Sequence, residues 1–188
     1  MVTFGNIKIM KISINIGHGG DGSNYDSGAI AADGTHEHDF NRDELVPLVI
    51  KELKNRNHSI VTIIQRKNFS ELPDRINEHN PDVVLSFHFN AFNGNATGTE
   101  MLYYKTSKRS KRLAECLQDN VVAVLGLADR GIKGLESGRG VALLKRTNAP
   151  CVILEPFFGD NQNDLNTARN NLDELAIAIC DALEVGMK

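Results

Sequence analysis

Three short apolar runs in this chain each stop at a residue that can bind a metal ion or carry a proton. They are residues 11–16 before His18, 83–87 before His88, and 151–154 before Glu155. Runs dense in β-branched and aromatic residues are typical of buried strands in parallel sheets. Ligands bind beyond the carboxyl ends of such strands. We therefore expect the two histidines and the carboxylate to meet in one cleft.

Helical patterns alternate with predicted strands along the rest of the chain. Further strands are predicted at residues 59–64 and 98–104, and helices at about 41–55, 71–79, 107–125 and after Asn161. Asp39 or Asn41 is a candidate cap for the first helix, and Pro47 should delay or bend it. Strands that alternate with helices favour right-handed crossovers. The predicted fold class is α/β, with a twisted, mainly parallel sheet flanked by helices on both faces.

Composition narrows the functional classes. The 188 residues are 41% hydrophobic and 24% charged, with a formal net charge of -3. This balance fits one soluble domain spanning 1–188, and it favours neither a nucleic-acid partner nor membrane insertion. The basic run 105–112 is interpreted as a solvated helix start; the alternative is a patch that meets an anionic polymer. Cys116, Cys151 and Cys180 lack metal-site spacing and are interpreted as small buried apolar residues.

The amino-terminal segment gives no secretory signal, since its apolar stretch is short and interrupted by Lys11. Met10 is a candidate translation start, which would make residues 1–9 an upstream extension. We expect synthesis in the cytoplasm and a monomeric protein.

The chemistry of the strand ends is that of a zinc site. Catalytic zinc takes three protein ligands and leaves one position open for water. His18 and His88 could supply two ligands, and the segment His36-Glu37-His38 is the obvious source of the third. Spacing alone does not choose among these three. A lone histidine at a strand end is more often a structural residue, and a structural ion pair is the alternative role for Glu155.

A series of motifs resembles the zinc-dependent N-acetylmuramoyl-L-alanine amidases of bacterial autolysins, spore-cortex enzymes and phage endolysins. The motifs are GHGG at 17–20, GTHE at 34–37, SFHFNA at 86–91, GTE at 98–100, RGIK at 130–133 and VILE at 152–155. Each motif is weak alone, but their order along nearly the whole chain is specific. The resemblance implies a sheet of about six strands.

The resemblance also implies the roles of individual residues. It makes His18, Glu37 and His88 the ligands of one zinc ion, and Glu155 the catalytic carboxylate. Its substrate would be bacterial peptidoglycan, cut at the amide between N-acetylmuramic acid and L-alanine. Asn90 and Arg139 are weaker candidates for substrate contacts.

Two other functions stay open at this point. A zinc exopeptidase could use the same ligand set on free peptides, and a peptidoglycan-binding module could have lost catalysis. The amidase interpretation predicts a phage or prophage endolysin, or a lytic autolysin, that reaches the cell wall after release from the cytoplasm.

Overall fold

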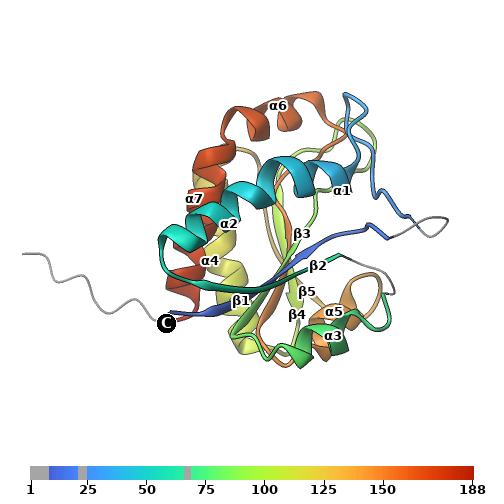
Figure 1. Ribbon diagram of the computed structural model, residues 1–188. Coiled ribbons are helices and arrows are strands. Elements are labelled where there is room, and N and C mark those ends of the chain that lie inside the picture. Colours follow the sequence, from blue (N-terminus) through green and yellow to red (C-terminus); the bar gives the residue numbers. More distant parts are fainter. Residues whose placement is uncertain (1–8, 21–24, 66–68) are drawn as a thin grey trace, which may run out of the picture.

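A six-stranded sheet with the strand order β2-β1-β3-β6-β4-β5 forms the centre of the molecule (Figure 1). This computed structural model describes residues 9–20, 25–65 and 69–188. The strands are β1 (Lys11–Ile16), β2 (Ser59–Gln65), β3 (Val83–Phe87), β4 (Thr99–Tyr104), β5 (Asp129–Leu135) and β6 (Cys151–Glu155). Residues 1–8 of the predicted extension lie outside the described residues, whereas Ile9 and Met10 are described. The prediction that translation starts at Met10 stays a prediction.

The three strands predicted to carry the site are neighbours at the middle of the sheet. β1 pairs with β3 and β3 with β6, all in parallel. Their register places Ile16 beside Phe87 and Phe87 beside Leu154. The carboxyl ends of these strands are therefore level at one edge of the sheet. β4 runs antiparallel to β6, and β5 follows the direction of β4, so the prediction of a mainly parallel sheet is confirmed.

Burial follows the position of each strand. Every residue of β3 is buried, whereas β4 alternates between buried and half-buried residues and the edge strand β5 is largely exposed. Helices on both faces of a parallel sheet select continuous apolar strands at its centre. β5 was not predicted, because its sequence DRGIKGL contains only two apolar side chains and two glycines.

Helices cover both faces of the sheet, as predicted. They are α1 (Glu37–Phe40), the π-helical segment η2 (Asn41–Leu45), α2 (Val46–Asn55), α3 (Leu72–Glu78), α4 (Lys108–Leu125), α5 (Val141–Arg146), α6 (Gln162–Asn170) and α7 (Leu172–Gly186). Figure 1 shows α2, α4 and α7 on one side and α3 and α5 on the other. Leu85 and Val152 belong to the larger core, and Val84 and Ile153 to the smaller core with α3 and α5. This alternation is the period of two expected of strands.

The first helix starts earlier than predicted. His36 is its N-cap, and Glu37 is its first residue, so the caps proposed at Asp39 and Asn41 were wrong. Pro47 does not delay the helix as predicted. The π-helical segment η2 ends two residues before Pro47, and Val46 N–H donates to the Asn41 carbonyl. A proline ring clashes with the carbonyl four residues earlier in a regular helix. A π turn changes that spacing and lets the helix continue.

The carboxyl-terminal region contains two helices where one was predicted. Asn161 caps α6 by accepting hydrogen bonds from the amides of Asn163 and Asp164. Asn171 then takes a non-helical conformation, with φ -126°, and α7 begins. Leu175, Ile179 and Leu183, which lie on one face of α7, are buried in the main core.

The surface matches the expectations from composition. Lys108, Arg109, Lys111 and Arg112 are exposed at the start of α4, as expected of a solvated helix face. Cys151 and Cys180 are buried, Cys116 is half-buried, and all three are free thiols. Among the helices of the described residues, none has the length and apolarity needed to cross a membrane.

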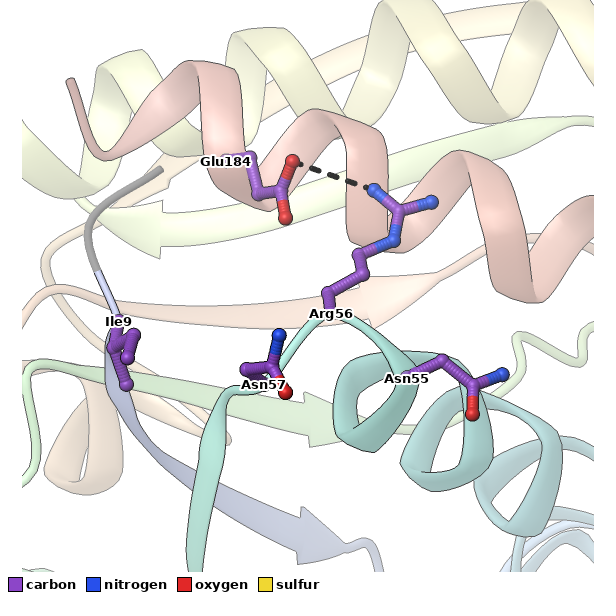
Figure 2. A pocket seen from close by; sticks show the side chains of 5 residues that line it. All are labelled: Ile9, Asn55, Arg56, Asn57 and Glu184. Atoms are coloured by element: carbon purple, nitrogen blue, oxygen red, sulfur yellow. Dashed lines mark ion pairs between the residues drawn. The ribbon is translucent and has the colours of Figure 1, made fainter. Parts of the chain in front are cut away.

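A hollow of about 510 Å³ lies beside the end of α2, away from the edge of the sheet that carries His18 and His88. Figure 2 shows its lining residues Ile9, Asn55, Arg56, Asn57 and Glu184. The guanidinium of Arg56 lies 3.5 Å from Glu184 and also pairs with Glu52 and Asp181. Its charge is thus satisfied within the protein, and we assign this hollow no chemistry.

Candidate metal centre

The level ends of β1, β3 and β6 place three predicted site residues side by side. The hydrogen-bond ladder extends past the strands: Gly17 N–H donates to the Phe87 carbonyl at 2.8 Å, and His88 N–H donates to the Leu154 carbonyl at 3.1 Å. His18 follows in a left-handed conformation, with φ 60°. The imidazole rings of His18 and His88 are edge to face, with centroids 5.1 Å apart.

Glu37 lies between the two histidines. Its Oε1 atom is 2.8 Å from His88 Nδ1, and its Oε2 atom is 3.2 Å from His18 Nε2. The side chain reaches this position because Glu37 is the first residue of α1, whose amino terminus faces the strand ends. One ligand atom from each of the three residues lies within 4.8 Å of the others. The structure therefore brings together the three residues that were predicted to bind zinc.

Backbone amides and two glycines hold the Glu37 carboxylate in place. Ala29 N–H donates to Oε2 at 3.0 Å, and Phe89 N–H donates to Oε1 at 3.3 Å. A Cβ atom at Gly17 would overlap the ring of His88, and one at Gly28 would come within 2.7 Å of Glu37 Oε2. Only glycine allows both backbones to approach the ligand side chains so closely.

The charges of this cluster support one another. Burial alone would raise the pKa of Glu37, but hydrogen bonds and charges from His18 and His88 lower it to about 2. Burial would lower the pKa of His18, but Glu37 and Asp26 outweigh it and raise the pKa above its usual 6.5. Glu37, only 3% exposed, is thus an ionised carboxylate in the interior, which requires cationic partners.

Asp26 is a partner of His18 that the sequence analysis missed. Its Oδ2 atom is 3.0 Å from His18 Nδ1, and its Oδ1 atom accepts a hydrogen bond from Gly28 N–H. A carboxylate on the second imidazole nitrogen fixes the ring orientation and the tautomer of a metal ligand. Asp26 lies in a stretch of the sequence rich in Gly, Ser and Asp, and its spacing from His18 gave no sign of this pairing.

Glu155 stands at the end of β6 in the same cleft, without an ion pair among the described residues. Its Oε2 atom is buried and has no hydrogen-bond partner within this part of the chain. Burial raises the pKa of Glu155 well above its usual value, and the negative charges of Glu37 and Glu100 raise it further. A buried carboxyl with a raised pKa in a cleft is typical of acid–base catalysts. The structural ion pair considered for Glu155 is therefore not found among the described residues.

The donor set suits zinc. Two imidazole nitrogens and one carboxylate are the protein ligands of one common class of catalytic zinc sites, which leave a position open for water. Asp26 supplies the outer hydrogen bond that such sites usually have. The cleft around these residues has a volume of about 740 Å³ and includes Glu155. It can thus admit a substrate beside the metal-binding side chains.

Comparison with known proteins agrees with this site. Residues 12–185 match the family model described as N-acetylmuramoyl-L-alanine amidase. The chain belongs to this family. The match begins at the second residue of β1 and ends within α7, so all four predicted zinc and catalytic residues lie inside it.

Among curated relatives of the family, the amidase LytC of Bacillus subtilis is 31% identical over 182 residues, which cover 90% of this chain and 34% of that protein. An uncharacterised cell wall amidase of Bacillus anthracis is 36% identical over 91 residues, covering 44% of this chain and 16% of that protein. The chain thus spans about a third or less of these two relatives.

Solved structures share the fold. The catalytic domain of the CD27L endolysin, which targets Clostridia difficile, has a TM-score of 0.79 and 26% identity, with 93% of this chain and 96% of that chain covered. The amidase Ami1 of Mycobacterium smegmatis has a TM-score of 0.81 at 20% identity, covering 97% of this chain and 99% of that chain. The predicted fold, with six strands and helices on both faces, is that of amidase catalytic domains.

The neighbours of Glu37 point elsewhere. His38 is buried, and its Nδ1 atom lies 2.8 Å from the Gly17 carbonyl oxygen, so it supports the loop before His18. Its ring also meets Tyr25 edge to face at 5.9 Å. His36 caps α1 through its backbone position and pairs with Ile30 in an isolated bridge. Of the three candidates from the sequence, Glu37 is the one that the structure places between His18 and His88.

Both weaker candidates for substrate contacts line the cleft. The Asn90 side chain donates to Glu100 Oε1 at 2.8 Å, and its own oxygen accepts from Ala91 N–H at 3.1 Å. Arg130 in turn donates to Glu100 Oε2 at 2.9 Å. Sequence analysis missed Glu100, because it did not predict that β4 is antiparallel and starts at the edge where the other strands end. Arg139 is exposed at the rim of the cleft.

Proposed function

We propose that this chain hydrolyses the amide bond between N-acetylmuramic acid and L-alanine in bacterial peptidoglycan, with zinc as its cofactor. The observation that carries the proposal is the meeting of His18, Glu37 and His88 beside the buried Glu155 in one cleft, within a chain of the amidase family.

One set of residues would bind the metal ion, and Glu155 would transfer the proton. His18 Nε2, His88 Nδ1 and the Glu37 carboxylate would hold one zinc ion, with Asp26 orienting His18. When bound, zinc supplies Lewis-acid polarisation of the scissile carbonyl and lowers the pKa of a water molecule toward about 7. The single negative charge of Glu37 and the two neutral imidazoles would leave part of the zinc charge uncompensated. The centre would therefore stay positive and stabilise an oxyanion.

Glu155 would carry the proton. Its carboxylate takes a proton from the attacking water as the oxygen–carbon bond forms. The same carboxyl then gives that proton to the amine nitrogen of L-alanine as the carbon–nitrogen bond breaks. A pKa raised by burial suits both steps, because the group can hold the proton between them.

The role of such an enzyme would be lytic, as an endolysin or autolysin. The likeness to an endolysin catalytic domain at 26% identity supports this part of the proposal. The monomeric state, and access to the wall after release from the cytoplasm, stay predictions.

Dye release from labelled cell walls, with and without a zinc chelator, tests the proposal. An amidase releases dye together with new amino groups on L-alanine, and it stops when chelated. An exopeptidase would free amino acids from unbound peptides and leave the muramoyl amide intact. A binding module would sediment with walls and release nothing. Either of the last two outcomes would overturn the proposed function.

A further inference from the structure

Arg139 is the only lysine or arginine among the described residues that line the cleft. The other charged groups there, apart from the histidines, are the carboxylates of Asp26, Glu37 and Glu155. These three carboxyl groups lie in or beside the metal-binding cluster, where Glu37 is a proposed ligand and Asp26 is a partner of His18. Away from the metal-binding side chains, the guanidinium of Arg139 is therefore the one positive group in the described lining that can attract a negative group of a ligand.

The backbone presents Arg139 at a fixed place. It lies between Gly138 and Gly140, whose φ angles are 94° and 79°, in the left-handed region. A Cβ atom on Gly140 would come within 2.6 Å of Ile153 Cδ1, so this loop rests directly on β6, two residues before Glu155. Gly140 also begins α5, with its carbonyl accepting from Leu144 N–H at 3.1 Å. The base of the side chain is therefore anchored, while its end is exposed.

Arg139 has no carboxylate partner among the residues that the structure describes. The nearest acidic residue in sequence, Glu136, pairs with Lys105 at 3.2 Å. Other arginines are engaged: Arg130 pairs with Glu100, and Arg169 with Glu44. A planar guanidinium with free donors can bind a carboxylate through two parallel hydrogen bonds.

An apolar wall lies next to Arg139 on the side of α3 and α5. Leu72 of α3, Leu102 of β4, Leu143 of α5 and Ile153 of β6 all line the cleft. This wall offers a surface for methyl and methylene groups. Together with one guanidinium, it forms a subsite for a short aliphatic chain that bears a carboxylate.

The substrate has a carboxylate on one side of the scissile bond only. The carboxyl group of the lactyl ether is consumed in the amide itself, so the sugar beside the bond is neutral. On the peptide side, L-alanine is followed by a glutamate joined through its side chain, whose main carboxyl group is free in some walls and amidated in others. The chemistry of the cleft thus matches the peptide side.

We propose that Arg139 binds the free carboxylate of the stem-peptide residue that follows L-alanine, and that it makes the chain select walls in which this group is not amidated. The inference rests on the proposed amidase function. It also fixes the direction of the substrate, with the peptide toward α3 and α5.

Three synthetic muramoyl tripeptides test the assignment with the zinc-loaded full chain. The first has the free carboxylate on the second residue and an amidated chain end. The second is amidated at both places, and the third is free only at the chain end. We expect the wild type to favour the first over the second roughly three- to tenfold in kcat/KM, mainly through KM, as for an exposed charge-assisted pair.

Substitutions of Arg139 should change the ratio of kcat/KM between the first and second substrates according to the charge that they leave. Arg139→Gln should bring it close to one, Arg139→Lys should restore part of it, and Arg139→Glu should reverse it. Arg109→Gln, an exposed arginine on α4 outside the cleft, is the matched control and should keep the wild-type ratio. Melting temperatures of all variants would verify that each is folded.

Other outcomes overturn the inference. A wild type that cleaves the first two substrates equally, or an Arg139→Gln variant that keeps the preference, would remove Arg139 from the subsite. A preference for the third substrate over the first would mean that Arg139 binds the carboxylate at the end of the peptide instead. In these cases the amide is still cut and the proposed function stands. If none of the three is cleaved, the amidase function and the subsite fail together.

Discussion

Glu100 of β4 and Glu155 of β6 are directly opposite each other across an antiparallel strand pair. Like charges at opposing positions are unfavourable, and the two carboxyl groups have different surroundings here. Glu100 is satisfied by Asn90 and Arg130, whereas Glu155 has a buried oxygen without a partner among the described residues. Burial, Glu37 and Glu100 all raise the pKa of Glu155. The site therefore keeps one carboxyl in an unfavourable setting.

This setting predicts an effect on stability in the metal-free protein. The folded pKa of Glu155 lies above its ordinary 4.5, so stability should fall as the pH rises from about that value through the folded pKa. Glu155→Gln removes this loss and should raise the melting temperature at pH 8, by about 2–4 °C for each kcal/mol regained. Thermal unfolding at pH 4 and pH 8 measures this. Glu115→Gln, an exposed control, should not show the pH-dependent gain.

Glu155→Gln should also abolish most activity. We expect wall hydrolysis to fall by at least about a hundredfold, because general acid–base catalysis contributes about a hundred- to ten-thousandfold. The zinc content should be unchanged. Dye release and elemental analysis on the same sample check both statements. A variant with nearly full activity would end the catalytic assignment.

Glu37 should differ sharply from its two histidine neighbours in metal binding. Glu37→Ala and His88→Ala should each lose zinc and activity. His36→Ala should keep both, and His38→Ala should keep zinc but melt at a lower temperature, because its ring supports the Gly17 carbonyl. Elemental analysis after gel filtration gives the zinc content. Loss of the metal in His36→Ala or His38→Ala alone would mean that the wrong residue of the three was chosen.

Asp26 should act through His18. Asp26→Asn removes the carboxylate from His18 Nδ1, and such outer partners typically change metal affinity about 10- to 100-fold. We expect zinc affinity to fall by that order in competition with a chromophoric chelator. Asp39→Asn, at a carboxylate that pairs with Arg42, is the control and should bind zinc as the wild type does. Equal affinity in the two variants would contradict the positioning role.

Zinc affinity should depend on pH in a defined direction. Zinc needs a neutral imidazole, and the metal-free pKa of His18 is raised above 6.5. Affinity should therefore decrease as the pH falls through that raised pKa, by about tenfold per pH unit for one competing proton. Glu37, with a pKa of about 2, stays ionised and adds nothing in this range. Competition with a chelator at a series of pH values between about 5 and 9 measures how steeply the zinc affinity changes with pH.

Sequence alone was sufficient for the central strands and for the residues at their ends. β1, β3 and β6 are continuous apolar runs, so burial on both faces could be deduced from composition. Their order in the sheet then placed His18, His88 and Glu155 together. The choice of Glu37 over His36 and His38 came from family resemblance, because all three lie near the start of one helix and local spacing is the same for each.

The parts that were missed depend on contacts between distant segments. β5 is held as an edge strand by its pairing with β4, although its own sequence is polar and rich in glycine. Asp26 gains its role from the turn that brings it to His18. Glu100 gains its role from the antiparallel direction of β4. None of these relationships is encoded in the periodicity of a single segment.

The place of β6 within the sheet has a consequence for the newly made chain. β6 is the last strand in sequence, yet it lies between β3 and β4 and joins the two halves of the sheet. Until the ribosome has delivered it, β4 and β5 have no strand through which to dock on β1, β2 and β3. The same strand carries Glu155. Assembly of the sheet and the arrival of Glu155 therefore coincide, and a nascent chain that stops before β6 lacks both the link between the two halves of the sheet and one wall of the cleft.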